Sequence, residues 1–349
     1  MLNNLTGLRF YAAFFVFLYH FFPVYTTIPK IEFFEIGFLG VDIFFILSGF
    51  ILTYVYYTKF FVNKLTGRDY WSFIVKRFAK IYPLHFIITL LFIPVTYIGK
   101  YLFHQDSLNI YPDTLIQNFL MIHSWDTTMH LSWNFPSWSI SAEWFAYLFL
   151  FAPLAYIYKL SRISLILMSV FIVLGFVAYW INIPEFILDR YTMNGLPRII
   201  PEFILGVLAG LMKIKINFNK KTASFLFLMS VIFLVLSFSY DLYFQQLCIF
   251  GFAGTILSLS YKTYFDDIFS SKLLIYLGNI SYAFYLTQFL SLIIYEQLFK
   301  ILFPDFWLPY IFVIQFSMAF IINFIFAALA YKYFEEPLRL LIVKKLIKK

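Results

Sequence analysis

Two ionisable residues, Arg9 and His20, stand near the ends of an otherwise aromatic and aliphatic stretch, LRFYAAFFVFLYH (residues 8–20). A histidine can act as a general base or carry a transferred group covalently. Eleven residues are close to three helical turns, so both side chains project from one face of a helix, roughly 16 Å apart along its axis. Ionisable residues inside a membrane segment mark functional sites by default. The alternatives without a functional role are that Arg9 snorkels to the membrane surface and that His20 is neutral and hydrogen-bonded to a neighbouring helix.

The next apolar stretch, GFLGVDIFFILSGFIL, contains one carboxylate, Asp42. Asp42 and His20 both lie eleven residues from the centre of the connection near Ile31, which places them at similar depth in an antiparallel helical hairpin. We therefore predict that Asp42 accepts a hydrogen bond from His20, which would fix the tautomer and leave the other ring nitrogen free as a base. The alternative is that Asp42 caps a broken helix or pairs with a different residue.

Further polar residues fall at the outer ends of two later apolar segments. They are Ser139, Ser141 and Glu143 in PSWSISAEW, and Arg198 and Glu202 in PRIIPEFILGV. A glutamate at a helix start can simply interact with the helix dipole, and either one alone favours that interpretation. Together, beside His20 and Asp42, they suggest the lining of a polar cavity that opens to the outside.

A basic pair, Arg77 and Lys80, lies at the end of a long inner connection of about residues 59–80, with Arg9 at a similar level. Basic residues next to a membrane usually set topology and contact anionic lipid. They can also hold the phosphates of a nucleotide-like donor from the cytoplasm. The charges thus describe a site that is cationic on the cytoplasmic side and carries histidine and carboxylates further out.

The composition identifies the elements that must position these residues. Of 349 residues, 62% are hydrophobic and only 13% are charged, and the mean hydropathy is +0.82. Soluble domains contain about 25% charged residues, so the chain is an integral membrane protein. The net charge of +8 reflects membrane topology rather than nucleic-acid binding. A single cysteine, Cys248, excludes a disulfide framework, and no set of residues has convincing metal-ligand spacing.

At roughly 20 apolar residues per crossing, the sequence predicts an all-α bundle of about ten transmembrane helices in one domain, residues 1–349. The first apolar segment is too long for a cleavable signal, so we expect it to remain as a span. With both termini in the cytoplasm, inner segments hold 20 Lys and Arg residues and outer segments hold 5. We expect a multi-pass protein of the plasma (inner) membrane. The predicted spans are 7–28, 34–58, 81–103, 141–158, 163–181, 198–212, 222–240, 243–261, 273–298 and 306–331.

Several motifs resemble the acyltransferase-3 family of membrane acyltransferases, in the family's order and over nearly the whole chain. The first is Arg9 followed after ten residues by His20. The others are GVDIFFILSGF (40–50), KRFAKIYP (76–83), WSISAE (138–143), RIIPEFILG (198–206), ISYAFYLTQ (280–288) and YKYFEEPL (331–338).

The resemblance implies transfer of an acyl group, usually acetyl from cytoplasmic acetyl-CoA, to a hydroxyl of an extracytoplasmic sugar. Arg9 and His20 match the pair regarded as catalytic in the family. Arg77 matches the first arginine of an arginine-x-x-arginine element thought to serve the donor. Lys80 stands at the second, where it keeps the charge but lacks the planar fork. Gln288 stands where many members have a histidine, so we assign it no catalytic role.

We accordingly expect an O-acetyltransferase with acyl-CoA as donor substrate, no permanently bound cofactor and a glycan or glycolipid acceptor in contact with membrane lipid. Because the chain has no fused esterase-like domain, it either completes the transfer itself or needs a separate partner. The alternative is a proton-coupled transporter or a polysaccharide flippase, because proton relays through Asp, Glu and His are typical of transporters.

Overall fold

The computed structural model describes residues 2–25, 32–102, 111–130, 132–182, 195–239, 247–302 and 311–347. Within these residues all regular structure is helical and there is no β-strand. The main helices are α1 (Asn3–Tyr25), α3 (Gly40–Tyr57), α4 (Gly67–Leu102), α6 (Trp138–Phe145), α7 (Phe151–Leu160), α8 (Arg162–Asn182), α10 (Leu196–Lys215), α11 (Lys220–Ser239), α13 (Cys248–Leu259), α15 (Lys272–Leu302), α16 (Ile311–Ala330) and α17 (Glu336–Ile347).

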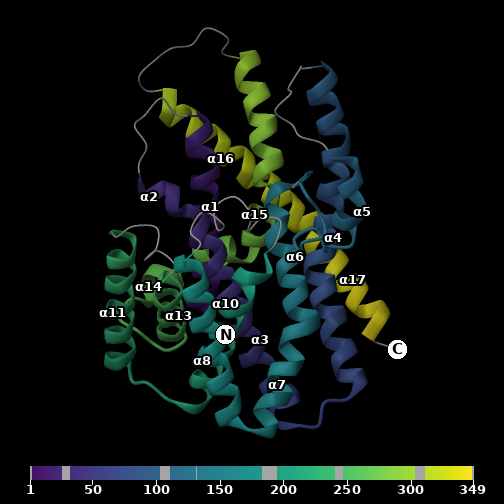
Figure 1. The fold of residues 1–349 in the computed structure, drawn as a ribbon. Coiled ribbons are helices and arrows are strands. Elements are labelled where there is room, and N and C mark those ends of the chain that lie inside the picture. The colour runs from purple at the N-terminus through teal and green to yellow at the C-terminus, as the bar shows by residue number, and fades with distance from the viewer. Residues whose placement is uncertain are drawn as a thin grey trace.

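Shorter segments complete the described chain. Three are α-helical turns, α2 (Glu32–Glu35), α5 (Leu115–Phe119) and α14 (Asp266–Phe269). Three are 3₁₀ turns, η1 (Ile36–Leu39), η3 (Pro112–Thr114) and η4 (Phe135–Ser137). Three are π-helical turns: η2 (Thr58–Val62) ends the helix that begins with α3, whereas η5 (Ala146–Leu150) and η6 (Tyr331–Glu335) lie within longer helices. In Figure 1, α3 and α10 lie near the centre, with α11, α13 and α14 on one side and α4 and α17 on the other.

Seven helical stretches of the described chain are long and apolar enough to cross a membrane, and α13 and residues 162–178 of α8 are shorter apolar helices. The prediction of an all-α, multi-pass membrane bundle is therefore confirmed. Helix α10 covers the predicted segment 198–212 and carries four charged residues, Arg198, Glu202, Lys213 and Lys215. The count of ten crossings and the cytoplasmic placement of both termini stay predictions.

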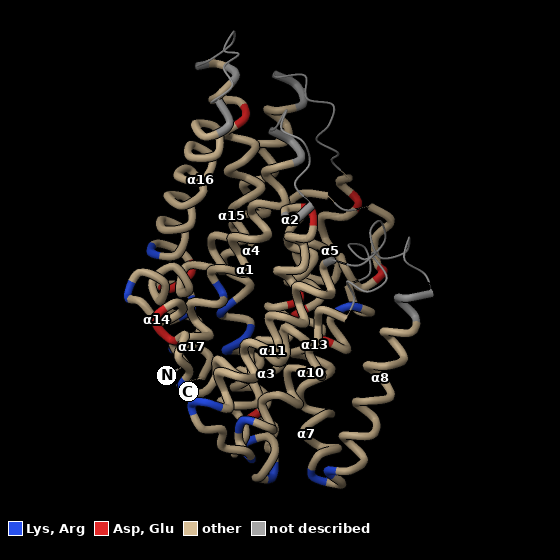
Figure 2. Tube along the Cα trace, turned by 90° about the vertical axis from the view of Figure 1, so that its left-hand side faces the viewer, with Lys and Arg blue, Asp and Glu red and all other residues tan. Residues whose placement is uncertain are grey.

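The basic residues are distributed asymmetrically along the bundle. In Figure 2, Lys and Arg residues occupy the lower half of the coloured trace, whereas the upper end of that trace shows only Asp and Glu. Such a bias is what the positive-inside rule predicts for the cytoplasmic end of a membrane protein. The lower end in this view is therefore the end at which we place the cytoplasm.

Helix α4 begins earlier than predicted, at Gly67 rather than near residue 81. The Thr66 hydroxyl accepts a hydrogen bond from the backbone N–H of Asp69 at 3.2 Å and donates one to the Asp69 carboxylate at 2.6 Å. This reciprocal cap satisfies groups that a helix start would otherwise leave unpaired. The inner connection of residues 59–80 is thus largely helical, and Arg77 and Lys80 stand on α4 one turn apart.

Helices α3 and α10 form the most extensive helix–helix contact of the bundle. Glycines bring their backbones together: a Cβ atom on Gly49 would lie 2.2 Å from the carbonyl oxygen of Phe203, and one on Gly206 would lie 2.0 Å from that of Ile46. Gly206 and Gly210 form a GxxxG pattern, the small-residue spacing that permits close helix packing in membranes. This contact fixes α3 at the centre of the fold.

We predict that Gly206→Ala lowers the thermal unfolding temperature in detergent, because overpacking costs roughly 1–3 kcal/mol and here the obstacle is backbone. Gly175→Ala in α8 is the matched control, since a Cβ atom there meets nothing within 4 Å. The control should unfold at or above the wild-type temperature, because alanine favours a helix over glycine by about 0.8–1.0 kcal/mol. Equal behaviour of the two variants would contradict the proposed close contact.

Candidate active site

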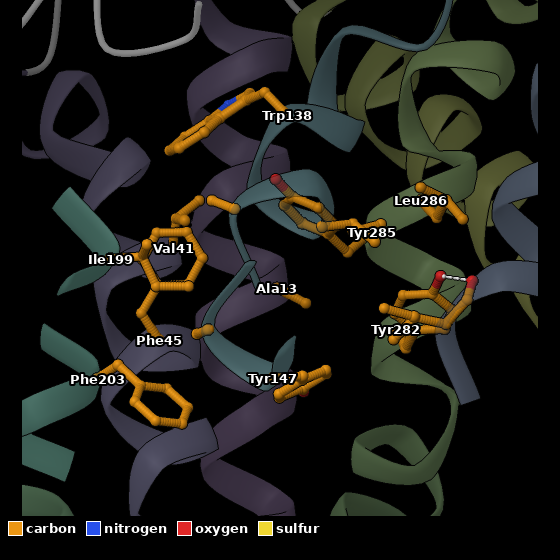
Figure 3. Close-up of a cluster of buried hydrophobic side chains, with 14 of the residues drawn as sticks. Ala13, Val41, Phe45, Trp138, Tyr147, Ile199, Phe203, Tyr282, Tyr285 and Leu286 are labelled. Atoms are coloured by element: carbon orange, nitrogen blue, oxygen red, sulfur yellow. Dashed lines mark hydrogen bonds between the residues drawn. The ribbon is translucent and has the colours of Figure 1, made fainter. Parts of the chain in front are cut away.

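A cavity of about 460 Å³ lies among α1, α3, α4, α6 and α15. Its volume is in the range of roughly 300–1,000 Å³ that is typical of small-molecule sites. Its polar wall contains Thr6, Arg9, Ser48, Arg77, Lys80, Ser139, Glu143, Tyr147, Asn279, Tyr282 and Tyr285, and its apolar wall contains Leu2, Leu5, Phe44, Phe45, Leu47, Ile51, Leu52, Tyr54, Val55, Ile81 and Ile140. Figure 3 shows part of this wall, with Phe45, Tyr147 and Tyr285 coming from different elements.

Three cations share this cavity: Arg9, Arg77 and Lys80. Lys80 forms an ion pair with Glu335, whose side chain is fully buried. Arg77 lies over the ring of Tyr56, 5.7 Å from its centroid, and neither Arg9 nor Arg77 forms an ion pair with any residue that the structure describes. Two guanidinium groups are therefore available to an anion, while Lys80 is partly neutralised by Glu335.

A second polar group in the cavity joins α3 to α6 and η5. The Ser48 hydroxyl donates a hydrogen bond of 2.5 Å to Oε1 of Glu143, the Tyr147 hydroxyl donates to the same oxygen, and the two hydroxyl oxygens are 2.9 Å apart. Nearby, the hydroxyls of Ser139 and Tyr285 are 2.8 Å apart. A carboxylate that accepts from two hydroxyls can remove a proton from one of them.

His20 is on the same uninterrupted helix as Arg9 but is not among the residues that line this cavity. Its imidazole is half-buried and packs edge-on against Phe135 at 6.2 Å. Its Nδ1 atom is buried and has no hydrogen-bond partner among the described residues, and the same holds for both amide atoms of Gln288, the side chain that interacts with the ring. Gln288 follows the cavity residue Tyr285 by one turn of α15, so His20 lies just beyond the cavity wall.

The predicted pair of His20 and Asp42 is wrong. Asp42 instead receives two hydrogen bonds from Arg198, from Nε at 2.8 Å and from Nη2 at 2.5 Å. Both side chains are almost fully buried, and Arg198 also donates to the carbonyl oxygen of Phe38 at 3.1 Å. Equal depth in the hairpin does not decide which way a side chain points, and a bidentate pair with a guanidinium is the stronger partner for a buried carboxylate. The alternative of a different partner for Asp42 is confirmed.

The predicted polar cavity formed by the outer ends of the fourth and sixth segments is divided among separate places. Ser139 and Glu143 line the cavity that also contains the cations. Ser141 is buried, donates to the carbonyl oxygen of Met121 at 2.9 Å and accepts from the N–H of Ser124 at 3.1 Å. Arg198 and Glu202 lie with Asp42, and Glu202 is fully buried 3.8 Å from Arg198. Ser141 is thus a structural residue, and Arg198 and Glu202 belong to a buried charge cluster.

Sequence analysis did not identify several residues of the site, among them Ser48, Tyr147 and Glu335. Ser139, Glu143 and Tyr147 recur every four residues in an apolar segment, which is a polar stripe on one helix face and was a usable signal. Ser48 is a lone serine in an apolar run, for which a backbone hydrogen bond is the ordinary expectation. Glu335 gave no signal of its partner, which is 255 positions away.

Comparison with known proteins identifies the family of the chain. The family model described as an acyltransferase domain matches residues 2–332. The chain belongs to this family. The acyltransferase MdmB of Streptomyces mycarofaciens is 35% identical over 157 residues, which are 42% of this chain and 38% of that protein. The peptidoglycan O-acetyltransferase OatA of Listeria monocytogenes is 30% identical over 159 residues, 42% of this chain and 24% of that protein.

The aligned parts thus span well under half of either curated relative. No solved structure matches the chain. The resemblance to the acyltransferase-3 family is therefore confirmed at the level of the family. The matched range, residues 2–332, includes every candidate site residue on α1, α3, α4, α6 and α10.

We predict that Asp42→Asn destabilises the acyltransferase-family fold by about 3–5 kcal/mol, because it removes the carboxylate that binds the buried Arg198 in a bidentate arrangement. Glu336→Gln is the matched control: it breaks an ion pair with Arg339 that is about one-third exposed, and such surface pairs contribute about 0–1 kcal/mol. Thermal unfolding in detergent measures both. Unfolding of Asp42→Asn at the wild-type temperature, with loss of activity only, would instead favour a catalytic role for Asp42.

Proposed function

We propose that this protein is a membrane O-acyltransferase of the plasma membrane that moves an acetyl group from cytoplasmic acetyl-CoA to a hydroxyl of an extracytoplasmic glycan or glycolipid. The observation that carries the proposal is the single cavity in which Arg9, Arg77 and Lys80 lie together with Ser48 and Glu143. The family membership and the acyltransferase names of its relatives support it.

The reaction exchanges one acyl bond for another. The acceptor oxygen bonds to the acetyl carbonyl carbon, the carbon–sulfur bond of the thioester breaks, and the acceptor proton ends on the released thiol. No electrons are gained or lost, so the site must supply anion binding, a base and exclusion of water. In our proposal Arg9 and Arg77 hold the donor phosphates, and the apolar wall of Phe44, Leu47 and Ile51 surrounds the rest of the donor and excludes water.

His20 is our candidate base for the acceptor hydroxyl. The half-buried ring stands beyond the cavity, about three turns further along α1 than Arg9. Its Nδ1 atom has no hydrogen-bond partner among the described residues, and Gln288, the side chain that interacts with the ring, is neutral, so the ring can accept a hydrogen bond from a substrate hydroxyl. A positioned general base contributes about 10²–10⁴-fold in rate.

We expect Arg77→Ala to raise the KM for acetyl-CoA by roughly 10- to 100-fold, because a charge-assisted hydrogen bond contributes about 1.5–3 kcal/mol. The KM for acetyl-pantetheine, which lacks the nucleotide phosphates, should not change. Arg68→Ala is the matched control, since Arg68 is an exposed cation near the start of the same helix. Equal losses with both donors would mean that Arg77 does not bind the phosphates.

We expect His20→Ala to leave a folded protein that reduces glycan O-acetylation by about 10²–10⁴-fold. The measurement is NMR of surface glycans from cells that lack the gene and carry the wild-type or variant copy. His130→Ala is the matched control, because His130 is exposed and its ring only stacks on Tyr111. An O-acetyl signal that persists in the gene deletion would refute the proposed acceptor class, whereas substrate accumulation without consumption of acetyl-CoA would favour a transporter.

A further inference from the structure

Ser48 is hydrogen-bonded differently from Ser230 and Ser237, two serines of the apolar helix α11. These two serines donate to the carbonyl oxygens of Leu226 and Phe233 in their own helix, each at 2.8 Å. This is how a serine in a membrane helix ordinarily satisfies its hydroxyl. Ser48 instead donates to Glu143 on a different helix, at 2.5 Å, and its side chain lines the cavity. Its hydroxyl is therefore paired with a potential base rather than with its own backbone.

The position of Ser48 is fixed in the membrane and in the fold. The span Ile36–Val62 places 12 residues before Ser48 and 14 after it, so the hydroxyl stands near mid-membrane. The next residue, Gly49, is pressed against the backbone of α10 at Phe203, which prevents α3 from shifting or rotating. Precise support of this kind is what a reacting group needs.

We propose that Ser48 is the acyl-accepting nucleophile of this protein and that Glu143 is its general base. This inference rests on the proposed function. A serine hydroxyl is a weak nucleophile at neutral pH and requires an adjacent base, and Glu143 is the group within hydrogen-bond distance. The Tyr147 hydroxyl donates to the same carboxylate oxygen and so holds Glu143 in place. Glu143, which the sequence predicted in a polar cavity that opens to the outside, thus serves the donor half of the reaction.

The proposed reaction has two halves, of which the first acetylates Ser48. Ser48 Oγ attacks the thioester carbonyl carbon while Glu143 takes the hydroxyl proton. The carbon–sulfur bond breaks, and the proton passes from Glu143 to the leaving sulfur, so that free CoA and an acetyl ester of Ser48 result. In the second half, the acceptor oxygen bonds to the same carbonyl carbon, the ester bond to Ser48 breaks, and the acceptor proton ends on Ser48 Oγ.

The surroundings of Ser48 suit a covalent intermediate. Phe44, Leu47 and Ile51 line the cavity on the same helix, and water excluded by such a wall cannot hydrolyse the ester. The cations Arg9 and Arg77 line the same cavity, which keeps the anionic donor on one side while the acyl group is handed over. An acyl-enzyme at this depth separates a donor that stays in the cytoplasm from an acceptor that stays outside.

The decisive test is isotope exchange between acetyl-CoA and labelled free CoA, in purified protein and without acceptor. An acyl-enzyme catalyses this exchange, whereas direct transfer to an acceptor does not. We expect exchange in the wild type, its loss in Ser48→Ala and slowing by about 10²–10⁴-fold in Glu143→Gln. Ser237→Ala, a buried serine outside the cavity, should exchange like the wild type. After acid quenching and proteolysis, the acetyl group should map to the peptide that contains Ser48.

Ser48→Cys separates chemistry from folding, because a thiol at this position should still exchange and should form a thioester that neutral hydroxylamine releases. Binding of acetyl-CoA and cellular O-acetylation are measured for every variant. A wild type that acetylates glycans but shows no exchange, exchange that persists in Ser48→Ala, or an acetyl group on Tyr147 or His20 would each overturn the inference and leave the proposed function standing. A wild type that neither binds nor consumes acetyl-CoA would overturn both.

Discussion

The buried ion pair between Asp42 and Arg198 and the glycine contact beside it hold the centre of the molecule. Arg198 binds both carboxylate oxygens of Asp42 and the carbonyl oxygen of Phe38, so α10 is tied to the beginning of α3 and to the turn before it. Gly49 and Gly206 then press the two helices together further along. Because α3 also supplies Ser48 to the cavity, the geometry of the candidate site depends on this pairing. The buried charge cluster of Asp42, Arg198 and Glu202 contains residue types that are common in catalytic sites, but here it holds two helices together.

The hydrogen bonds of this ion pair also explain why the buried guanidinium group of Arg198 is tolerated in an apolar bundle. Removing ions from water is costly, and the cost is offset only when the partners are close and well hydrogen-bonded. Arg198 meets Asp42 in a bidentate arrangement and lies 5.4 Å from the ring centroids of both Phe38 and Trp138, so two aromatic rings also stabilise the cation. The two carboxylates, Asp42 and Glu202, surround one cation, which keeps that cation fixed and unavailable to an external anion. Among the described residues, the guanidinium groups in the cavity that form no ion pair are those of Arg9 and Arg77.

Sequence reasoning succeeded where depth in the membrane was the only question. Apolar length identified the helices, and the placement of Arg9, Arg77 and Lys80 at one level anticipated their shared cavity. It failed where the rotation of a helix decided the outcome. His20 and Asp42 were correctly matched in sequence distance, yet Asp42 faces α10, whose Arg198 is 156 positions away. Periodicity cannot reveal which of several distant helices a polar side chain faces, and a one-residue π-helical insertion such as η5 or η6 changes that direction without any clear trace in the sequence.

Helix α1 sets the distance between the cations of the cavity and His20. It runs from Asn3 to Tyr25 without a break, with Arg9 in the cavity and His20 beyond its wall, roughly 16 Å further along the axis. The proposed base is therefore far from the cations that we propose bind the donor. It can act on an acceptor but is poorly placed to act on the thioester at the same time, since reacting atoms must come within about 3–3.5 Å. The Ser48–Glu143 pair lines the cavity with the cations, and Tyr285, one turn from Gln288, joins that wall to the surroundings of His20. Transfer through an intermediate held on α3 divides this distance into two shorter steps, each with its own base.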